Sequence, residues 1–296
     1  MTSPTRGRTW PALAAAGTTT LLWASAFVSI RDAAASYSPG ALALGRLLSG
    51  SATLALMLAA TRTGWPPRAA WPGIACSGVL WFGVYMVTLN WGEQLVDAGT
   101  AAMVVSLGPV LITLLSARLL GEGLPRPLLW GTAVAFTGAL TVGLATADTD
   151  TASVAGVLLC LAAAATYALG VVSQKPALRH ATALQVSAFG CMVGALTCLP
   201  FAPTLAREVA HAPASATANM VYLGVFPTAV AFTTWAFALA RMPAGRLGAT
   251  TYLVPVLVVA LSWLVLGEVP HPLALLGGAL CLAGVALSRR PSTLPT

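Results

Sequence analysis

The residues that could bind or position a ligand are few in this sequence, and they lie inside long apolar runs. Arg46 is the one formal charge well within such a run, and its guanidinium carries five hydrogen-bond donors. An arginine at the centre of a membrane helix costs about 3 kcal/mol, so it must face protein or water. The sequence therefore assigns Arg46 either to a ligand carboxylate or an outer gate, or to a structural tie at a neighbouring broken helix.

Aromatic and polar side chains in the other apolar runs are candidates to line a ligand cavity. A phenol or an indole N–H that is removed from water needs a hydrogen-bond partner, and a ligand can supply one. Together with Arg46, the candidates are Trp23, Ser25, Tyr85, Tyr167, Gln174, Trp235 and Tyr252. Asn90 and Trp91 lie near the end of their run, where anchoring at lipid headgroups is the alternative explanation.

Two prolines, Pro109 and Pro255, lie in the middle of apolar runs at equivalent places. A proline removes one backbone hydrogen bond and clashes with the preceding turn, so each is predicted to bend its helix. A symmetric pair of such bends fits hinges that shape a central cavity as well as it fits two static kinks.

The sequence gives little support for a catalytic, metal or cofactor site. No Asp, Glu or His lies deep in an apolar run, and the five cysteines form no Cys-x-x-Cys pair, so we predict no enzyme, metal site or cofactor. Glu122 and Glu268 each follow a glycine, and we expect them to cap the next helix or to pair with Arg118 or Arg126. Glu93, near the end of its run, is the nearest exception to the absence of buried acids.

The apolar runs dominate the composition of the chain. Its 296 residues are 57% hydrophobic and 8% charged, where a soluble domain carries about 25% charged residues. A water-soluble fold could not hide so much apolar surface. Ten runs reach the length of about 20 residues that spans a bilayer. They cover roughly residues 10–30, 40–61, 72–92, 98–119, 128–147, 154–174, 183–203, 217–240, 246–267 and 272–288.

Most positive charges between these runs lie on one side of the membrane. If the N-terminus is cytoplasmic, the outside loops carry only Arg31 and Arg207. The inside segments carry Arg6, Arg8, Arg62, Arg68, Arg118, Arg126, Lys175, Arg179, Arg241, Arg246, Arg289 and Arg290. This asymmetry follows the positive-inside rule and predicts that both termini are cytoplasmic. The net charge of +7 therefore reflects membrane topology, and nucleic-acid binding is not predicted.

The sequence repeats itself, without a gap, after 146 positions. The matching pairs are Pro109 and Pro255, Glu122 and Glu268, Gly131 and Gly277, and Gly138 and Gly284. We divide the chain into repeats at 1–147 and 148–296. Since five spans per repeat is an odd number, the second repeat must enter the membrane inverted, as in secondary transporters. The four glycines predict close packing of the fifth and tenth spans with each other or with another protomer.

Several short motifs follow one another along the chain, and their order and spacing together are specific. They are Trp23-Ala24-Ser25-Ala26-Phe27, Leu42-Ala43-Leu44-Gly45-Arg46, Ala98-Gly99-Thr100-Ala101-Ala102, Leu120-Gly121-Glu122 and Thr251-Tyr252-Leu253-Val254-Pro255-Val256. In this order the chain resembles the EamA-type branch of the drug/metabolite transporter superfamily over nearly its whole length. The resemblance implies a ten-helix inverted-repeat transporter, commonly an exporter of amino acids or other small metabolites, with a central cavity between its halves. One departure is Tyr167, where many members carry a tryptophan motif.

We therefore expect an all-α integral membrane protein with ten transmembrane helices in the inner membrane of a bacterial-type cell. Its expected function is export of small neutral or zwitterionic metabolites, such as amino acids, by alternating access. The expected partners are the substrate and the lipid bilayer, and the chain works as a monomer or a homodimer. A membrane-embedded enzyme, a channel and a membrane protein without transport activity are the alternatives.

Overall fold

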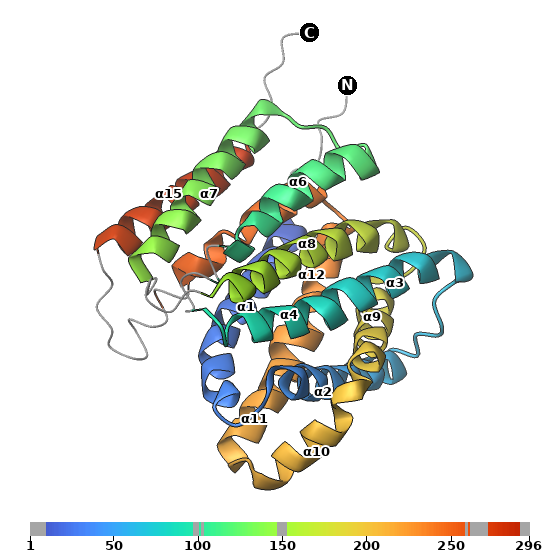
Figure 1. Ribbon diagram of the computed structural model, residues 1–296. Coiled ribbons are helices and arrows are strands. Elements are labelled where there is room, and N and C mark those ends of the chain that lie inside the picture. Colours follow the sequence, from blue (N-terminus) through green and yellow to red (C-terminus); the bar gives the residue numbers. More distant parts are fainter. Residues whose placement is uncertain are drawn as a thin grey trace.

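The computed structural model of the chain describes residues 10–96, 101, 104–146, 153–257, 260 and 272–290. The predicted repeat boundary at residue 147, Glu268, Arg6 and Arg8 lie outside this range. The described part is helical and contains no strand (Figure 1). The all-helical prediction is therefore confirmed for these residues.

The helices of the first repeat follow the predicted spans. Their bounds are α1 Trp10–Ala34, α2 Pro39–Ala60, α3 Trp71–Ser77, η3 Gly78–Val84, α4 Tyr85–Gly92, α6 Leu107–Leu120 and α7 Arg126–Thr146. Those of the second repeat are α8 Val154–Ala177, α9 Ala183–Thr197, α10 Ala202–His211, α11 Ala214–Leu223, η6 Gly224–Val230, α12 Ala231–Leu239, α13 Ala244–Thr250 and α15 Pro272–Ser288. Short 3₁₀ turns, η2 Arg68–Ala70 and η5 Leu199–Phe201, precede α3 and α10.

Five helical stretches among the described residues are long and apolar enough to cross a membrane, and a sixth is added if α9 and the bent segment after it form one span. Two shorter apolar helices, Leu107–Leu120 and Leu275–Ser288, accompany them. The chain is therefore a multi-span helical protein, and the full set of ten spans stays a prediction.

The seventh predicted span differs from its predicted form. The sequence predicts one helix over residues 183–203, but α9 ends at Thr197 and the chain bends by 53° into the segment Leu199–His211. Pro200 has no backbone N–H and cannot continue the α-helical hydrogen bonds, which accounts for the break. In the bent segment, the carboxylate of Glu208 accepts hydrogen bonds from the backbone N–H of Ser38 at 2.9 Å and from its hydroxyl at 3.2 Å. The connection between the predicted spans 183–203 and 217–240 thus contains the helix α10, and its Glu208 holds the start of α2.

Each repeat contains a π-helical turn at the same place. The segments η3 and η6 are both π-helical, and each residue of η3 has its equivalent in η6 146 positions later. A π-helical turn leaves backbone carbonyls out of register with the α-helical hydrogen bonds, and such turns occur often at functional sites. Both turns begin at a glycine that packs tightly against the other repeat. Gly78 lies against the Gly190 carbonyl, and Gly224 lies against the Arg46 carbonyl.

The two prolines expected to bend continuous helices instead follow interruptions. Ser106 is a turn residue just before α6, so Pro109 lies in the first turn of that helix. In the second repeat α13 ends at Thr250, and Thr251 and Tyr252 form a turn before the helical residues 253–257 that contain Pro255. A proline suits a first helical turn because its missing N–H would be unpaired there anyway. Each interruption lies in the turn before its proline, where the missing N–H removes a helical hydrogen bond, so the bends and hinges stay a prediction.

The helices α7 and α15 pack closely against each other and run antiparallel (Figure 1). Gly131 lies against the Gly284 carbonyl, and Gly138 lies against the Gly277 carbonyl. Between these pairs, the Cys281 thiol lies 3.5 Å from the carbonyl oxygen of Ala135, its own equivalent in the first repeat. The predicted contact of the two glycine-bearing helices with each other is confirmed. A residue can touch its own equivalent only on a two-fold axis, so this interface is arranged as in a symmetric dimer.

Replacing Gly138 by valine should destabilise the protein, because a Cβ atom there would lie 2.6 Å from the backbone nitrogen of Cys281. We expect the free energy of unfolding to fall by about 1–3 kcal/mol, as for other overpacked cores. Thermal unfolding in detergent measures the change. Gly17→Val is the matched control, because a Cβ atom at Gly17 meets nothing within 4 Å. Equal stability of the two variants would contradict this account of the interface.

Candidate substrate cavity

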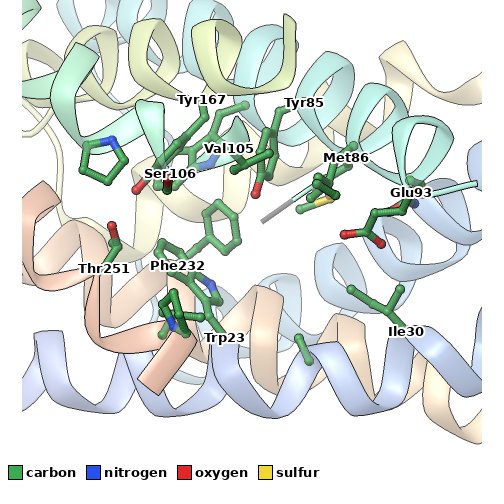
Figure 2. Close-up of a pocket in the computed structure, with 18 of the residues that line it drawn as sticks. Trp23, Ile30, Tyr85, Met86, Glu93, Val105, Ser106, Tyr167, Phe232 and Thr251 are labelled. Atoms are coloured by element: carbon green, nitrogen blue, oxygen red, sulfur yellow. The ribbon is translucent and has the colours of Figure 1, made fainter. Parts of the chain in front are cut away.

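A cavity of about 160 Å³ lies between the two repeats (Figure 2). Helices from both repeats contribute to its wall, and most of its surface is apolar. Its lining comprises Trp23, Ala26, Ile30, Arg46, Trp81, Tyr85, Met86, Leu89, Asn90, Glu93, Ala101, Val105, Ser106, Pro109, Tyr167, Phe232, Thr251, Tyr252, Val254 and Pro255. A concave, largely apolar site with a few converging polar groups is the usual form of a small-molecule site.

Aromatic rings form one wall of the cavity. The ring of Trp81 has its centroid 4.6 Å from that of Phe232, 5.4 Å from that of Tyr167 and 6.0 Å from that of Trp23. Tyr85 continues the wall, with its ring 5.6 Å from Tyr167. Close tilted and edge-on pairs of this kind fix each other's orientation. The wall is therefore a rigid surface that suits an apolar or cationic group of a ligand.

Arg46 is held at the second π-helical turn. Its Nε donates to the hydroxyl of Thr228 at 2.7 Å, and that hydroxyl donates to the carbonyl of Leu223 at 2.9 Å. Thr228 lies in η6 and Leu223 precedes it, so the arginine ties α2 to the irregular backbone of the other repeat. The structural tie foreseen from the sequence is present, and Arg46 is also a lining residue of the cavity.

An acidic side chain faces the same cavity. Glu93 follows the last residue of α4, and Figure 2 shows its carboxylate directed toward the cavity between Met86 and Ile30. Nearby, Asn90 donates to the Pro39 carbonyl at 3.1 Å, which joins α4 to the start of α2. Arg46 and Glu93 both line the cavity, which thus has one positive and one negative group at its wall.

The helix breaks of the two repeats meet at the inner part of the cavity. The hydroxyl of Tyr252 donates to the carbonyl of Ser106 at 3.0 Å, and these two turn residues are equivalents 146 positions apart. Thr251, Pro109 and Pro255 line the cavity beside them. The broken segments of both repeats therefore adjoin the cavity and each other.

The candidate residues from the sequence fall into two groups. Trp23, Arg46, Tyr85, Tyr167, Tyr252, Pro109 and Pro255 line the cavity. Ser25, Gln174 and Trp235 do not. The hydroxyl of Ser25 pairs with that of Tyr222 at 2.7 Å, while Gln174 and Trp235 are fully buried farther along their helices.

Trp81 and Phe232 line the cavity but were not singled out from the sequence. A signal for both was present. Trp81 lies four residues before Tyr85, and Phe232 lies three residues before Trp235, so each shares a helix face with a candidate. Within the described residues, no three His, Cys, Asp or Glu side chains gather in a way that could hold a metal ion.

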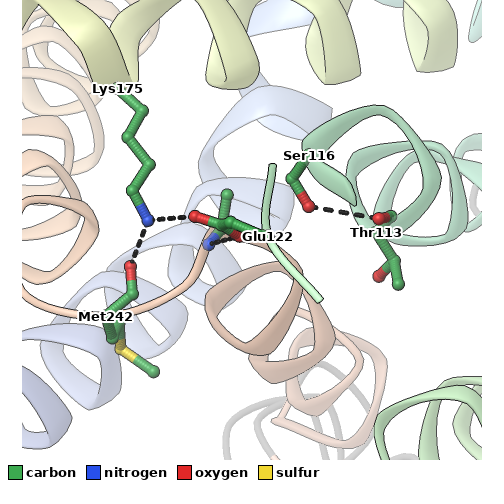
Figure 3. A network of polar contacts seen from close by, with 6 residues as sticks. Thr113, Ser116, Glu122, Lys175 and Met242 are labelled. Carbon is green, nitrogen blue, oxygen red and sulfur yellow. Dashed lines mark hydrogen bonds and ion pairs between the residues drawn. The ribbon is translucent and has the colours of Figure 1, made fainter. Parts of the chain in front are cut away.

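A polar network joins the two repeats outside the cavity (Figure 3). Lys175, near the end of α8, forms an ion pair with Glu122 and donates to the Met242 carbonyl at 2.7 Å. The second carboxylate oxygen of Glu122 accepts from the backbone N–H of Ala244 at 2.7 Å, at the start of α13. The expectation that Glu122 caps the next helix is therefore corrected: it caps α13 of the other repeat, and its charge partner is Lys175 and neither Arg118 nor Arg126. The partner was missed because it lies in the other repeat, 53 positions away in sequence.

This network and Glu93 lie at opposite ends of the molecule. Gly92, beside Glu93, packs against Cys160 on α8. Lys175 is fifteen residues farther along the same helix, a distance of about 22 Å at 1.5 Å per residue. We call the group Glu122, Lys175, Met242 and Ala244 the latch.

An all-helical chain with two equivalent halves, irregular helix turns and a cavity between the halves is the architecture of a membrane transporter. The sequence pattern of the EamA-like transporter family matches the chain twice, at residues 10–144 and 154–290. The chain belongs to the EamA-like transporter family. The resemblance inferred from its motifs is thereby confirmed.

Known proteins agree with this assignment. A probable terminal-alkyne amino-acid exporter of Streptantibioticus cattleyicolor is 40% identical over 274 residues, which cover 92% of this chain and 91% of that protein. The uncharacterized transporter YdfC of Bacillus subtilis is 33% identical over 267 residues, which cover 90% of this chain and 87% of that protein. One crystal structure matches with a TM-score of 0.77 at 23% identity, over 94% of this chain and 96% of that one. That likeness shows a shared fold.

The latch should contribute to stability as a coupled unit, because its two charged side chains are only 19% and 15% exposed. A double-mutant cycle with Glu122→Gln and Lys175→Met isolates their interaction from other effects of each substitution. We expect a coupling free energy of about 1–3 kcal/mol, above that of exposed pairs. Thermal or denaturant unfolding in detergent provides the four values. Additive effects of the two substitutions would show that the pair does not hold the two repeats together.

Proposed function

We propose that this chain exports amino acids, as zwitterions, through the cavity between its repeats. The observation that carries the proposal is the placement of Arg46 and Glu93 on one cavity that also has an aromatic wall. The relative in Streptantibioticus cattleyicolor, named as an exporter of a terminal-alkyne amino acid, supports the same class of substrate.

The charges of the cavity favour a zwitterion over other small molecules. A carboxylate beside Arg46 and an ammonium group beside Glu93 each gain an opposite charge, which offsets the loss of water from both. A ligand with a net charge would gain the opposite charge of only one of the two protein groups. The aromatic wall then accepts an apolar or aromatic side chain.

The proposed topology is that of ten transmembrane helices in two inverted repeats, 1–147 and 148–296, with both termini in the cytoplasm. The antiparallel packing of α7 and α15 supports the inversion, because these helices are equivalents. The positive-inside asymmetry of the loops supports the orientation. The membrane is the inner membrane of a bacterial-type cell, since the relatives named above are bacterial.

This arrangement suits alternating access. In the proposed orientation the Glu93 end of the cavity faces outward and the latch closes the cytoplasmic end. The breaks before Pro109 and Pro255 serve as hinges, because residues at helix breaks can absorb changes in backbone angles. One chain supplies the whole cavity, so a monomer suffices, and a homodimer would contain two independent paths.

Transport by purified protein in liposomes tests the function, with radiolabelled leucine and phenylalanine as probes. We expect uptake of both, with the methyl ester and N-acetyl derivatives competing at least about tenfold less well, a loss of about 1.4 kcal/mol. Arg46→Gln should abolish discrimination against the ester, and Glu93→Gln should abolish discrimination against the N-acetyl derivative. Arg207→Gln, at an exposed arginine, is the control. Liposomes that move no amino acid with the unmodified protein would refute the proposal.

The hinges have a separate test. In Pro109→Ala and Pro255→Ala the new backbone N–H can extend the helix through the preceding break, so motion at the break should be restricted. We expect slower transport in both variants, with an unchanged yield of folded protein. Transport rates and size-exclusion profiles provide the comparison. A parallel loss of yield and transport would assign both prolines to folding alone.

A further inference from the structure

Two fully buried polar side chains lie outside the cavity and have no hydrogen-bond partner. They are Gln174 on α8, with both amide atoms unpaired, and Trp235 on α12, with its indole N–H unpaired. Buried polar atoms in native proteins are nearly always paired, because an unpaired one loses its bonds to water without compensation. The two side chains therefore destabilise this conformation, and their presence needs an explanation.

Both side chains lie between the cavity and the latch. On α8, Tyr167 lines the cavity and Lys175 belongs to the latch, and Gln174 is one residue before Lys175. On α12, Phe232 lines the cavity, Trp235 follows three residues later, and the chain then reaches Met242 of the latch. Gln174 therefore lies beside the latch, and Trp235 lies about one helical turn from the lining of the cavity.

Packing contacts link Trp235 and α8, which carries Gln174, to the aromatic wall of the cavity. Trp81, which lines the cavity, lies with its ring 5.6 Å from that of Trp235. The same tryptophan packs directly against Gly170 of α8. Gln174 is four residues beyond Gly170 and therefore on the same helix face, about 6 Å farther from the cavity. Trp235 therefore packs on the aromatic wall, and Gln174 lies one helical turn beyond the point where α8 meets that wall.

We propose that Gln174 and Trp235 form a second substrate site, which is closed in this conformation and opens toward the cytoplasm when the latch separates. The amide and indole N–H groups donate to the carboxylate of an amino acid, and the amide oxygen accepts from its ammonium group. These are the groups that a zwitterion requires, and none of them is charged. The inference rests on the proposed function, since it concerns the entry of the same substrate.

The neutrality of this site has a consequence for the direction of transfer. An uncharged pair of donors holds a carboxylate less strongly than a guanidinium does. A substrate that enters from the cytoplasm at Gln174 and Trp235 therefore passes to a stronger site at Arg46. The two sites then act in sequence along one path.

Gln174→Leu tests the proposal because leucine has a similar size and removes both unpaired amide atoms. We expect two changes of opposite sense: the thermal unfolding temperature rises, and the KM for leucine uptake into inside-out membrane vesicles rises about tenfold. Trp235→Phe, which removes the indole N–H, should raise the same KM. Thr132→Val is the matched control, because the Thr132 hydroxyl is also buried and unpaired but lies on α7. This control should gain stability with no change in KM.

The outcomes separate the two proposals. Transport of leucine by the unmodified protein with an unchanged KM in Gln174→Leu would overturn the second site and leave the exporter function intact. A Gln174→Leu variant that is less stable or fails to fold would also overturn it, since the amide would then stabilise the closed state. Absence of leucine and phenylalanine transport by the unmodified protein would refute the exporter function itself.

Discussion

The close approach of backbone to backbone across the two repeats is the constraint on which the rest of the structure depends. In lipid, helices gain little from burying apolar side chains against each other, so association relies on tight packing and polar contacts. Glycines provide that packing between α7 and α15, and again where the π-helical turns meet the opposite repeat. Because each contact joins one repeat to the other, the cavity is formed by the interface itself. Neither repeat could build it alone.

The same interface determines where polar groups can be tolerated. Arg46 is acceptable within α2 because the π-helical turn of the other repeat offers it Thr228. The backbone at Ser106 is irregular, and the hydroxyl of Tyr252 from the other repeat satisfies its carbonyl. Irregular backbone and polar side chains therefore compensate each other across the interface. This distribution leaves charged groups at one end of the path, neutral ones in the middle and an ion pair at the other end.

Much of this arrangement follows from the sequence, and the remainder has identifiable physical reasons. The repeat, the apolar spans, the glycine contacts and the tie made by Arg46 leave signals in residue type and spacing. The π-helical turns leave none, because one extra residue in a turn does not alter hydropathy. The exact place of the break before Pro109 has no signal, since a proline fits both a bend within a helix and a first turn. The partnership of Glu122 with Lys175 depends on tertiary packing between repeats, which local spacing cannot reveal.

The contact between Tyr252 and Ser106 makes the two repeats inequivalent. The positions are equivalents, but one carries a phenol long enough to reach across the axis and the other a short hydroxymethyl group. If the repeats exchange conformations, the symmetry-equivalent hydrogen bond would have to be donated by the hydroxyl of Ser106 to the carbonyl of Tyr252. The side chain of Ser106 is too short to make it. The hydrogen bond thus belongs to one of the two states only. Although its two repeats are nearly identical, the protein would therefore favour the conformation that contains this hydrogen bond. A single side chain on the two-fold axis contributes to that preference.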